Sequence, residues 1–123
     1  MPTVYAFDVD ETLEISNGPV KLQALMDLRV QGHIVGICGN MGLFCRVPGW
    51  QHLASFLGQS YLTKEAFLHG LKVNIPADDY VMVGNIYGRV NSLGFVCQSR
   101  CSEAAATAGW RFILEDDFAK GAR

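Results

Sequence analysis

The chain has 123 residues, half of them apolar and 18% of them charged, with a formal net charge of −2. This composition excludes a disordered chain, and the length suits one compact domain over residues 1–123. The charge balance gives no basic field for nonspecific nucleic-acid binding. No apolar run approaches the roughly 20 residues of a membrane helix, and no basic segment precedes an apolar one at the N-terminus. We therefore expect a cytoplasmic protein with no membrane partner.

The predicted elements alternate between strands and helices along the chain. The strands are short apolar runs, predicted over residues 3–9, 33–38, 80–83 and 110–114. The helices are predicted from apolar residues at spacings of three and four, or from a start signal. They cover residues 20–31 after Asn17-Gly18-Pro19, residues 50–57, and a segment from the cap Thr63 to about Leu71. Two more are predicted from Ser102 to the stop at Gly109 and, as a short helix, from Asp116.

Three segments of the sequence are predicted to lack regular structure. Residues 39–49 are rich in glycine and proline and are predicted to form a loop. Residues 58–60 are predicted to end one helix and separate it from the next. Residues 86–101 fit either an irregular insert or a strand around Phe95-Val96-Cys97.

The order of these elements predicts an α/β fold with a parallel sheet. Strand–helix–strand units have right-handed crossovers, so the loops after successive strands lie along one edge of the sheet. That edge is predicted to gather polar residues from three loops, namely Asp8, Asp10 and Thr12, then Cys38, Gly39 and Asn40, then Gly84 and Asn85.

Asp8 and Asp10 are the most informative pair in the chain. They follow directly on an apolar strand, where two carboxylates are costly unless a cation or a proton is shared between them. Oxygen ligands of this kind suit Mg²⁺, which is usually held by one or two carboxylates together with a substrate phosphate. The alternative is that both acids only cap or turn the chain after the strand.

At these residues the chain resembles the haloacid dehalogenase superfamily, whose members are mostly Mg²⁺-dependent phosphatases and phosphotransferases. The first motif of that family is an apolar strand followed by D-x-D-x-[TV], and residues 7–13, Phe-Asp-Val-Asp-Glu-Thr-Leu, match it fully. The second motif corresponds to the strand that leads into Cys38-Gly39-Asn40, with a thiol or glycine in place of a hydroxyl. Lys64 fits the lysine of the third motif better than Lys72 does. The fourth corresponds to residues 81–84 followed by Asn85, where the family has an acid.

The resemblance implies a three-layer, Rossmann-like sheet flanked by helices, and a phosphomonoester hydrolase. Asp8 would be the nucleophile that forms an aspartyl-phosphate, and Asp10 would be the general acid and base. Asp8, Asp10 and Asn85 would hold Mg²⁺. The phosphorylated substrate would be bound by Thr12, which ties the loop, by Cys38, Gly39 and Asn40, and by the positive charge of Lys64.

Three points stay open. Because Asn85 stands where the family has an acid, the chain can also be a catalytically degenerate member with a binding or regulatory role. Glu103 either replaces that acid or is only a first-turn residue favoured by the helix dipole. Neither connector is long enough for the cap domain of many relatives. The open site then suits a large substrate, or needs a second copy to close it, which leaves a homo-oligomer open.

Overall fold

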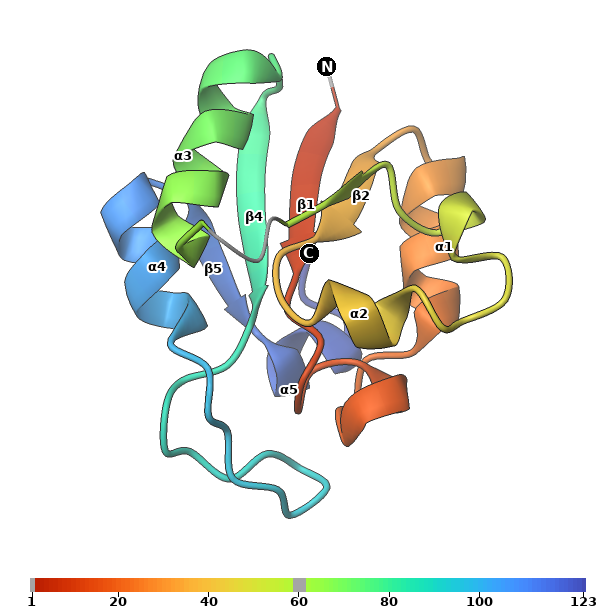
Figure 1. The fold of residues 1–123 in the computed structure, drawn as a ribbon, viewed down its shortest axis with the longest axis vertical. Coiled ribbons are helices and arrows are strands. Elements are labelled where there is room, and N and C mark those ends of the chain that lie inside the picture. The colour runs from red at the N-terminus through yellow and green to blue at the C-terminus, as the bar shows by residue number, and fades with distance from the viewer. Residues whose placement is uncertain (1, 59–61) are drawn as a thin grey trace.

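The computed structural model describes residues 2–58 and 62–123. In these residues, five parallel strands form one sheet in the order β3-β2-β1-β4-β5 (Figure 1). The strands are β1 (Thr3–Phe7), β2 (Ile34–Ile37), β3 (Phe56–Leu57), β4 (Asp79–Gly84) and β5 (Arg111–Leu114). The α-helices are α1 (Leu22–Val30), α2 (Met41–Phe44), α3 (Lys64–Asn74), α4 (Cys101–Ala108) and α5 (Glu115–Ala119), with short 3₁₀ turns at Glu14–Ser16 and Trp50–His52.

Helices cover both faces of the sheet, which confirms the predicted α/β class with a parallel sheet. The alternation of side chains along β1 divides the core between the two faces. Tyr5 and Phe7 pack in a cluster with residues of α1, α2 and α5, whereas Val4 and Ala6 pack in a cluster with residues of α3 and α4. Since β1 is the central strand and is buried on both faces, the chain after Phe7 emerges at the middle of the sheet edge.

Most of the predicted elements are confirmed with small changes at their ends. The first strand ends at Phe7 rather than at residue 9, and the strand predicted over residues 80–83 extends over Asp79–Gly84. Thr63 caps α3 as predicted, because its side chain accepts a hydrogen bond from the amide of Ala66 at 3.2 Å. Gly109 ends α4 in the left-handed conformation, with φ of 74°, which glycine adopts without steric cost.

The helix predicted over residues 50–57 is wrong. Only Trp50–His52 makes a 3₁₀ turn, and Phe56–Leu57 is the edge strand β3. The ring of Phe56 lies where a side chain on Gly36 would be, since a Cβ built there would be 2.4 Å from the ring. The missing side chain of Gly36 therefore lets this segment approach β2 as a strand.

Two other boundaries differ from the prediction. The loop predicted over residues 39–49 contains the short helix α2, which Asn40 caps by accepting from the amide of Leu43. The helix predicted from residue 20 begins at Leu22, because Val20 pairs with Leu13 in an isolated bridge. The break predicted at residues 58–60 falls mainly on Gln59 and Ser60, which lie outside the described residues.

Residues 86–100 form an irregular loop that projects beyond the carboxyl ends of β4 and β5 (Figure 1). Val90 and Val96 form one isolated antiparallel bridge across it. The prediction of an irregular insert is therefore confirmed, and the alternative of a strand around residues 95–97 is wrong. Several of its large apolar side chains are exposed, namely Ile86, Tyr87, Val90, Leu93, Phe95 and Val96. No helix in the described part of the chain has the length and apolar character needed to cross a membrane.

Candidate functional site

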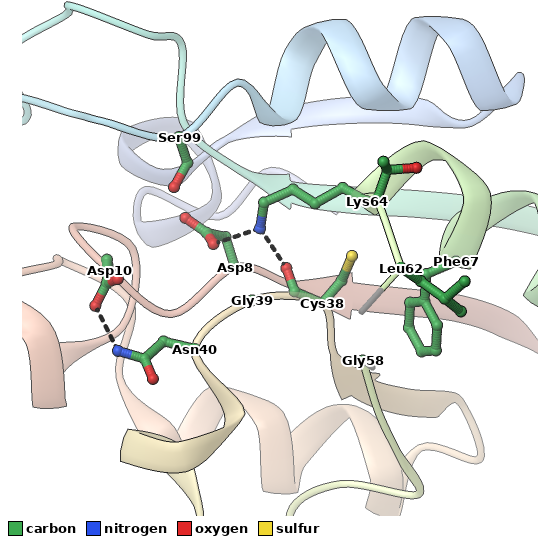
Figure 2. A pocket seen from close by; sticks show the side chains of 11 residues that line it. Asp8, Asp10, Cys38, Gly39, Asn40, Gly58, Leu62, Lys64, Phe67 and Ser99 are labelled. Carbon is green, nitrogen blue, oxygen red and sulfur yellow. Dashed lines mark hydrogen bonds and ion pairs between the residues drawn. The ribbon is translucent and has the colours of Figure 1, made fainter. Parts of the chain in front are cut away.

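A pocket of about 370 Å³ opens at the carboxyl ends of β1 and β2, as the strand order predicts (Figure 2). The predicted site residues from three separate segments meet there. Its lining consists of Asp8, Asp10, Cys38, Gly39, Asn40, Gly58, Leu62, Thr63, Lys64, Phe67 and Ser99. Six of the eight residues predicted to form the site are among them.

Asp8 and Lys64 form the centre of the pocket. The Lys64 ammonium donates to Asp8 Oδ1 at 2.9 Å and to the Cys38 carbonyl at 2.7 Å (Figure 2). Asp8 is only 2% exposed. A carboxylate buried to this degree is costly unless it is paired, and Lys64 supplies the pairing charge. The structure thus brings together two residues that are 56 positions apart in the chain.

The Asp8 carboxylate keeps Lys64 protonated, and burial keeps the Cys38 thiol neutral. Burial lowers the pKa of Lys64, but the neighbouring Asp8 carboxylate more than offsets this, and the pKa is raised overall. Burial raises the pKa of the Cys38 thiol to about 11, against the opposing effect of Lys64. Because the thiolate is the reactive form of cysteine, the raised pKa argues against Cys38 as a nucleophile at neutral pH.

Gly39 leaves the space that the Asp8 carboxylate occupies. A Cβ built on Gly39 would lie 2.6 Å from Asp8 Oδ1 and 3.1 Å from the amide nitrogen of Val9. The first motif and the loop after β2 are thus in direct contact at this point. Glycine at this position therefore has a steric reason that is separate from the predicted phosphate binding, since any larger residue would displace the central carboxylate.

We expect Gly39→Ala to displace Asp8 and to destabilise the fold by about 1–3 kcal/mol, the usual cost of overpacking. Gly42→Ala is the matched control, because a Cβ on Gly42 has only Asn40 Oδ1 nearby, at 3.8 Å. Chemical denaturation of both variants measures the difference. Equal stability of the two variants would contradict the contact between Gly39 and Asp8.

Asp10 lies at the rim of the pocket and is held away from Asp8. Its Oδ1 accepts hydrogen bonds from Ser16 Oγ at 2.7 Å and from Asn40 Nδ2 at 3.3 Å. Figure 2 shows Asn40 reaching across from the loop after β2 to this carboxylate. Asn40 therefore contacts Asp10 through its amide nitrogen while its oxygen caps α2.

Thr12 and Asn85 lie beneath the pocket, and both are fully buried. Thr12 Oγ1 donates to Asp8 Oδ2 at 3.4 Å and accepts from Asn85 Nδ2 at 3.1 Å. Asn85 Nδ2 also donates to the carbonyl of Glu11, which has a left-handed φ of 55°. This conformation is uncommon for a residue with a side chain, and a second amide, that of Asn91, donates to the same carbonyl at 3.1 Å. The turn after β1 is thus held by two asparagines.

Glu115 is a residue of this site that the sequence interpretation missed. It is fully buried, and its Oε2 accepts from Asn85 Nδ2 at 3.3 Å. A signal was present, because β4 and β5 are neighbours with Gly84 paired to Leu114, so the next residues of each strand, Asn85 and Glu115, emerge side by side. Glu103 does not take this place. It is exposed, pairs with Arg100 and fits the interpretation as a first-turn residue.

Arg89 connects the irregular loop to Glu115. Its guanidinium donates to Glu115 Oε1 at 2.7 Å and to Asp116 Oδ2 at 2.6 Å. Burial raises the pKa of Glu115, an effect that hydrogen bonds and Arg89 partly oppose. Burial also acts to raise the pKa of Asp116, but hydrogen bonds from Arg89 and Ser92 hold it below its ordinary value. Arg89 is thus the cation that compensates two buried acids.

The oxygen atoms near Asp8 fit a divalent cation only in part. No group of three or more acidic, histidine or cysteine side chains in the described residues is arranged to hold a metal. However, Asn85 Oδ1 is buried and has no hydrogen-bond partner among the described residues. An orphaned buried acceptor is costly, and a cation would satisfy it. Among the residues that the structure describes, Asp8 Oδ2 accepts only the long hydrogen bond from Thr12, so it also remains available.

The fold and the site together define an α/β protein with a buried, lysine-paired aspartate at the edge of a parallel sheet. No protein-family model, curated protein or solved structure matches the chain. The function of the chain is therefore proposed from the geometry of the site and from the motifs.

Proposed function

We propose that the chain is a Mg²⁺-dependent phosphomonoester hydrolase of the haloacid dehalogenase type, without a cap domain, that acts through an aspartyl-phosphate. The observation that carries the proposal is the contact between Asp8 and Lys64 in an open pocket. A carboxylate held beside a fixed cation, with polar groups of two further loops around it, suits the attack of an anionic nucleophile on an anionic phosphoryl group.

In the proposed reaction Asp8 is the nucleophile, and Asp10 acts first as general acid and then as general base. Asp8 attacks phosphorus, the bond from phosphorus to the ester oxygen breaks, and Asp10 gives its proton to the leaving alkoxide. Asp10 then takes a proton from water, which attacks the phosphorylated Asp8 and releases phosphate. Mg²⁺, when bound, neutralises phosphate charge and aligns the attack. Asp8 and Asn85 have the oxygens available to hold it, and Asp10 is the third predicted ligand.

The remaining pocket residues have roles in binding. Lys64 provides a positive charge that stays in place at neutral pH, since its pKa is raised. The backbone amides of the loop over Cys38, Gly39 and Asn40 are candidates for donors to phosphoryl oxygens. Because the pocket is open on the solvent side, we propose a phosphorylated substrate larger than the pocket, of a class that the site residues do not specify.

Lys64→Met tests this proposal against a matched variant on the same helix, Lys72→Met. We expect Lys64→Met to lower Mg²⁺-dependent hydrolysis of an aryl phosphate at least about 100-fold, because a group that stabilises transition-state charge is lost. Lys72 instead donates to the carbonyl of Gly109, so Lys72→Met should retain full activity. Turnover by the unaltered protein that survives a metal chelator, or equal activity of the two variants, would contradict the proposal.

A binding or regulatory role is the second candidate. It is favoured by Asn85, which brings no charge to the proposed metal site. For this candidate we expect inorganic phosphate and Mg²⁺ to bind in calorimetry while aryl phosphate is not hydrolysed.

A further inference from the structure

The side-chain amide of Asn85 has its nitrogen on one side and an orphaned oxygen on the other. The nitrogen faces three oxygens, namely Thr12 Oγ1 at 3.1 Å, the Glu11 carbonyl at 3.2 Å and Glu115 Oε2 at 3.3 Å. Asn85 Oδ1 has no hydrogen-bond partner in the described part of the chain, although the whole residue is buried.

The three neighbours of Asn85 Nδ2 all act as acceptors. A carbonyl and an ionised carboxylate can only accept, and the hydroxyl hydrogen of Thr12 is directed to Asp8 Oδ2. A flipped amide would therefore place its oxygen against three acceptors and leave its nitrogen unpaired. Of the three, Glu115 is the only charged group, and hydrogen bonds to charged groups are about twice as strong as neutral ones.

Glu115 is itself held so that it cannot turn away from Asn85. It is fully buried at the start of α5, and its second oxygen accepts from Arg89 at 2.7 Å and lies 3.9 Å from the Cys97 thiol. Both oxygens are therefore engaged, one toward the loop and one toward Asn85. Removing the acceptor at residue 115 would take away the one charged acceptor of this amide and leave the pocket lining, to which Glu115 does not belong, unchanged.

We propose that Glu115 is a positioning residue, which fixes the Asn85 amide so that its oxygen is the free ligand atom for a divalent cation beside Asp8. This inference rests on the proposed function for the identity of the ligand, but the orientation of the amide can be measured without it. Asn85 brings no charge itself, and the carboxylate that faces its amide nitrogen is that of Glu115, at the start of α5 directly after β5.

The test compares Glu115→Met, which lacks the acceptor, with Glu115→Gln, which keeps one. In nitrogen-15 NMR spectra, the resonances of the Asn85 side-chain amide are identified by their loss in Asn85→Asp. We expect slow hydrogen exchange of this amide in the unaltered protein and in Glu115→Gln. In Glu115→Met, exchange should be at least about tenfold faster, while backbone amides of β1 and β4 keep their protection. Unchanged exchange of the Asn85 amide in folded Glu115→Met would overturn the proposal.

A thermodynamic cycle keeps the proposal testable if Glu115→Met does not fold. Asn85→Asp alone places a second buried carboxylate against Glu115 and should destabilise the fold. In the double variant Asn85→Asp/Glu115→Gln the acid and the amide are exchanged, so we expect it to regain most of that loss. Strictly additive effects in chemical denaturation would refute the pairing.

Addition of Mg²⁺ to the same NMR samples separates this inference from the proposed function. A shift of the Asn85 resonances in the unaltered protein that weakens in Glu115→Met supports both. If the Asn85 resonances do not shift with Mg²⁺ while their slow exchange depends on Glu115, Asn85 Oδ1 is not a Mg²⁺ ligand. The positioning of the amide by Glu115 would still stand.

Discussion

Asp8→Asn should lower the turnover of an aryl phosphate at least about 1,000-fold and leave the protein folded. The loss follows because an amide oxygen is a far weaker nucleophile than a carboxylate and cannot form the aspartyl-phosphate. Asparagine has nearly the same shape as aspartate, so the packing of residue 8 against Gly39 is retained. The amide oxygen can still accept from Lys64 at the position where Asp8 Oδ1 does, at 2.9 Å.

Steady-state hydrolysis with saturating Mg²⁺, together with circular dichroism, measures both parts of this prediction. Asp27→Asn is the matched control, because Asp27 is exposed on α1, where it accepts a hydrogen bond from Gln23. It should leave both turnover and stability unchanged. Residual turnover near that of the unaltered protein in Asp8→Asn would remove Asp8 as the nucleophile.

A second readout addresses the intermediate directly. Rapid acid quenching during turnover should trap a phosphoryl group on the peptide that contains Asp8. Acyl phosphates hydrolyse more slowly in the acid of the quench than at neutral pH. Mass spectrometry of the digested chain would locate it. A labelled peptide that contains Cys38 instead of Asp8 would point to a different nucleophile, against the raised pKa of that thiol.

The sequence was sufficient to predict those parts of the site that depend on local signals. Asp8 and Asp10 could be placed at the sheet edge because an apolar strand ends immediately before them. For these acids and the loop after β2, the prediction required only that the strands be parallel, which the alternation of elements indicates. Lys64 was predicted from its match to the third motif of the family that the chain resembles, and the fold brings it within hydrogen-bond distance of Asp8.

The parts that the sequence did not predict depend on contacts between distant segments. Periodicity cannot separate a helix from an edge strand in segments as short as Trp50–His52 and Phe56–Leu57. The contact that lets Phe56–Leu57 pair as a strand is made with Gly36, which is distant in the sequence. Glu115 appears in the sequence as one acid of three at a helix start. Its role depends on the pairing of β4 with β5, which places it beside Asn85.

The irregular loop over residues 86–100 is tied to the body of the protein by polar contacts rather than by an apolar core. Asn91 is buried and donates to the carbonyls of Glu11 and Asn17, at 3.1 and 2.9 Å. Arg89 connects the same loop to the start of α5. The loop therefore braces both the turn that presents Asp8 and the acid that faces Asn85, so its loss should affect the site as well as stability.

Arg89→Met should destabilise the fold by about 2–3 kcal/mol at pH 7, the largest effect that we expect from a residue outside the pocket. Removing one partner of a buried ion pair typically costs 3–5 kcal/mol, because the other charge is left uncompensated. Here two acids are left, and Glu115 is fully buried. The Arg89 side chain is 34% exposed, so water reaches the pair and we expect a cost below that range.

Arg100→Met is the matched control for this variant, since Arg100 comes from the end of the same irregular segment. Its partner is Glu103 at 3.1 Å, and their side chains are 60% and 62% exposed. Exposed pairs contribute about 0–1 kcal/mol, so this variant should unfold at nearly the same denaturant concentration as the unaltered protein. Equal losses in Arg89→Met and Arg100→Met would show that the buried acids do not depend on Arg89.

The stability gap between the unaltered protein and Arg89→Met should narrow as the pH falls from 7 toward 4. The pKa of Glu115 is raised, so its ionisation weakens the fold, and protonation relieves the variant that lacks Arg89 more than the unaltered protein. The pKa of Asp116 is lowered in the folded protein, so its contribution is fully present above its ordinary pKa of about 3.8 and is lost only below that value. Between pH 7 and 4 the narrowing therefore comes from Glu115, and Asp116 adds to it below this range. Denaturant titrations at several pH values measure the gap, and a gap that widens toward acid would contradict the assignment of Arg89 as the cation that compensates these two carboxylates.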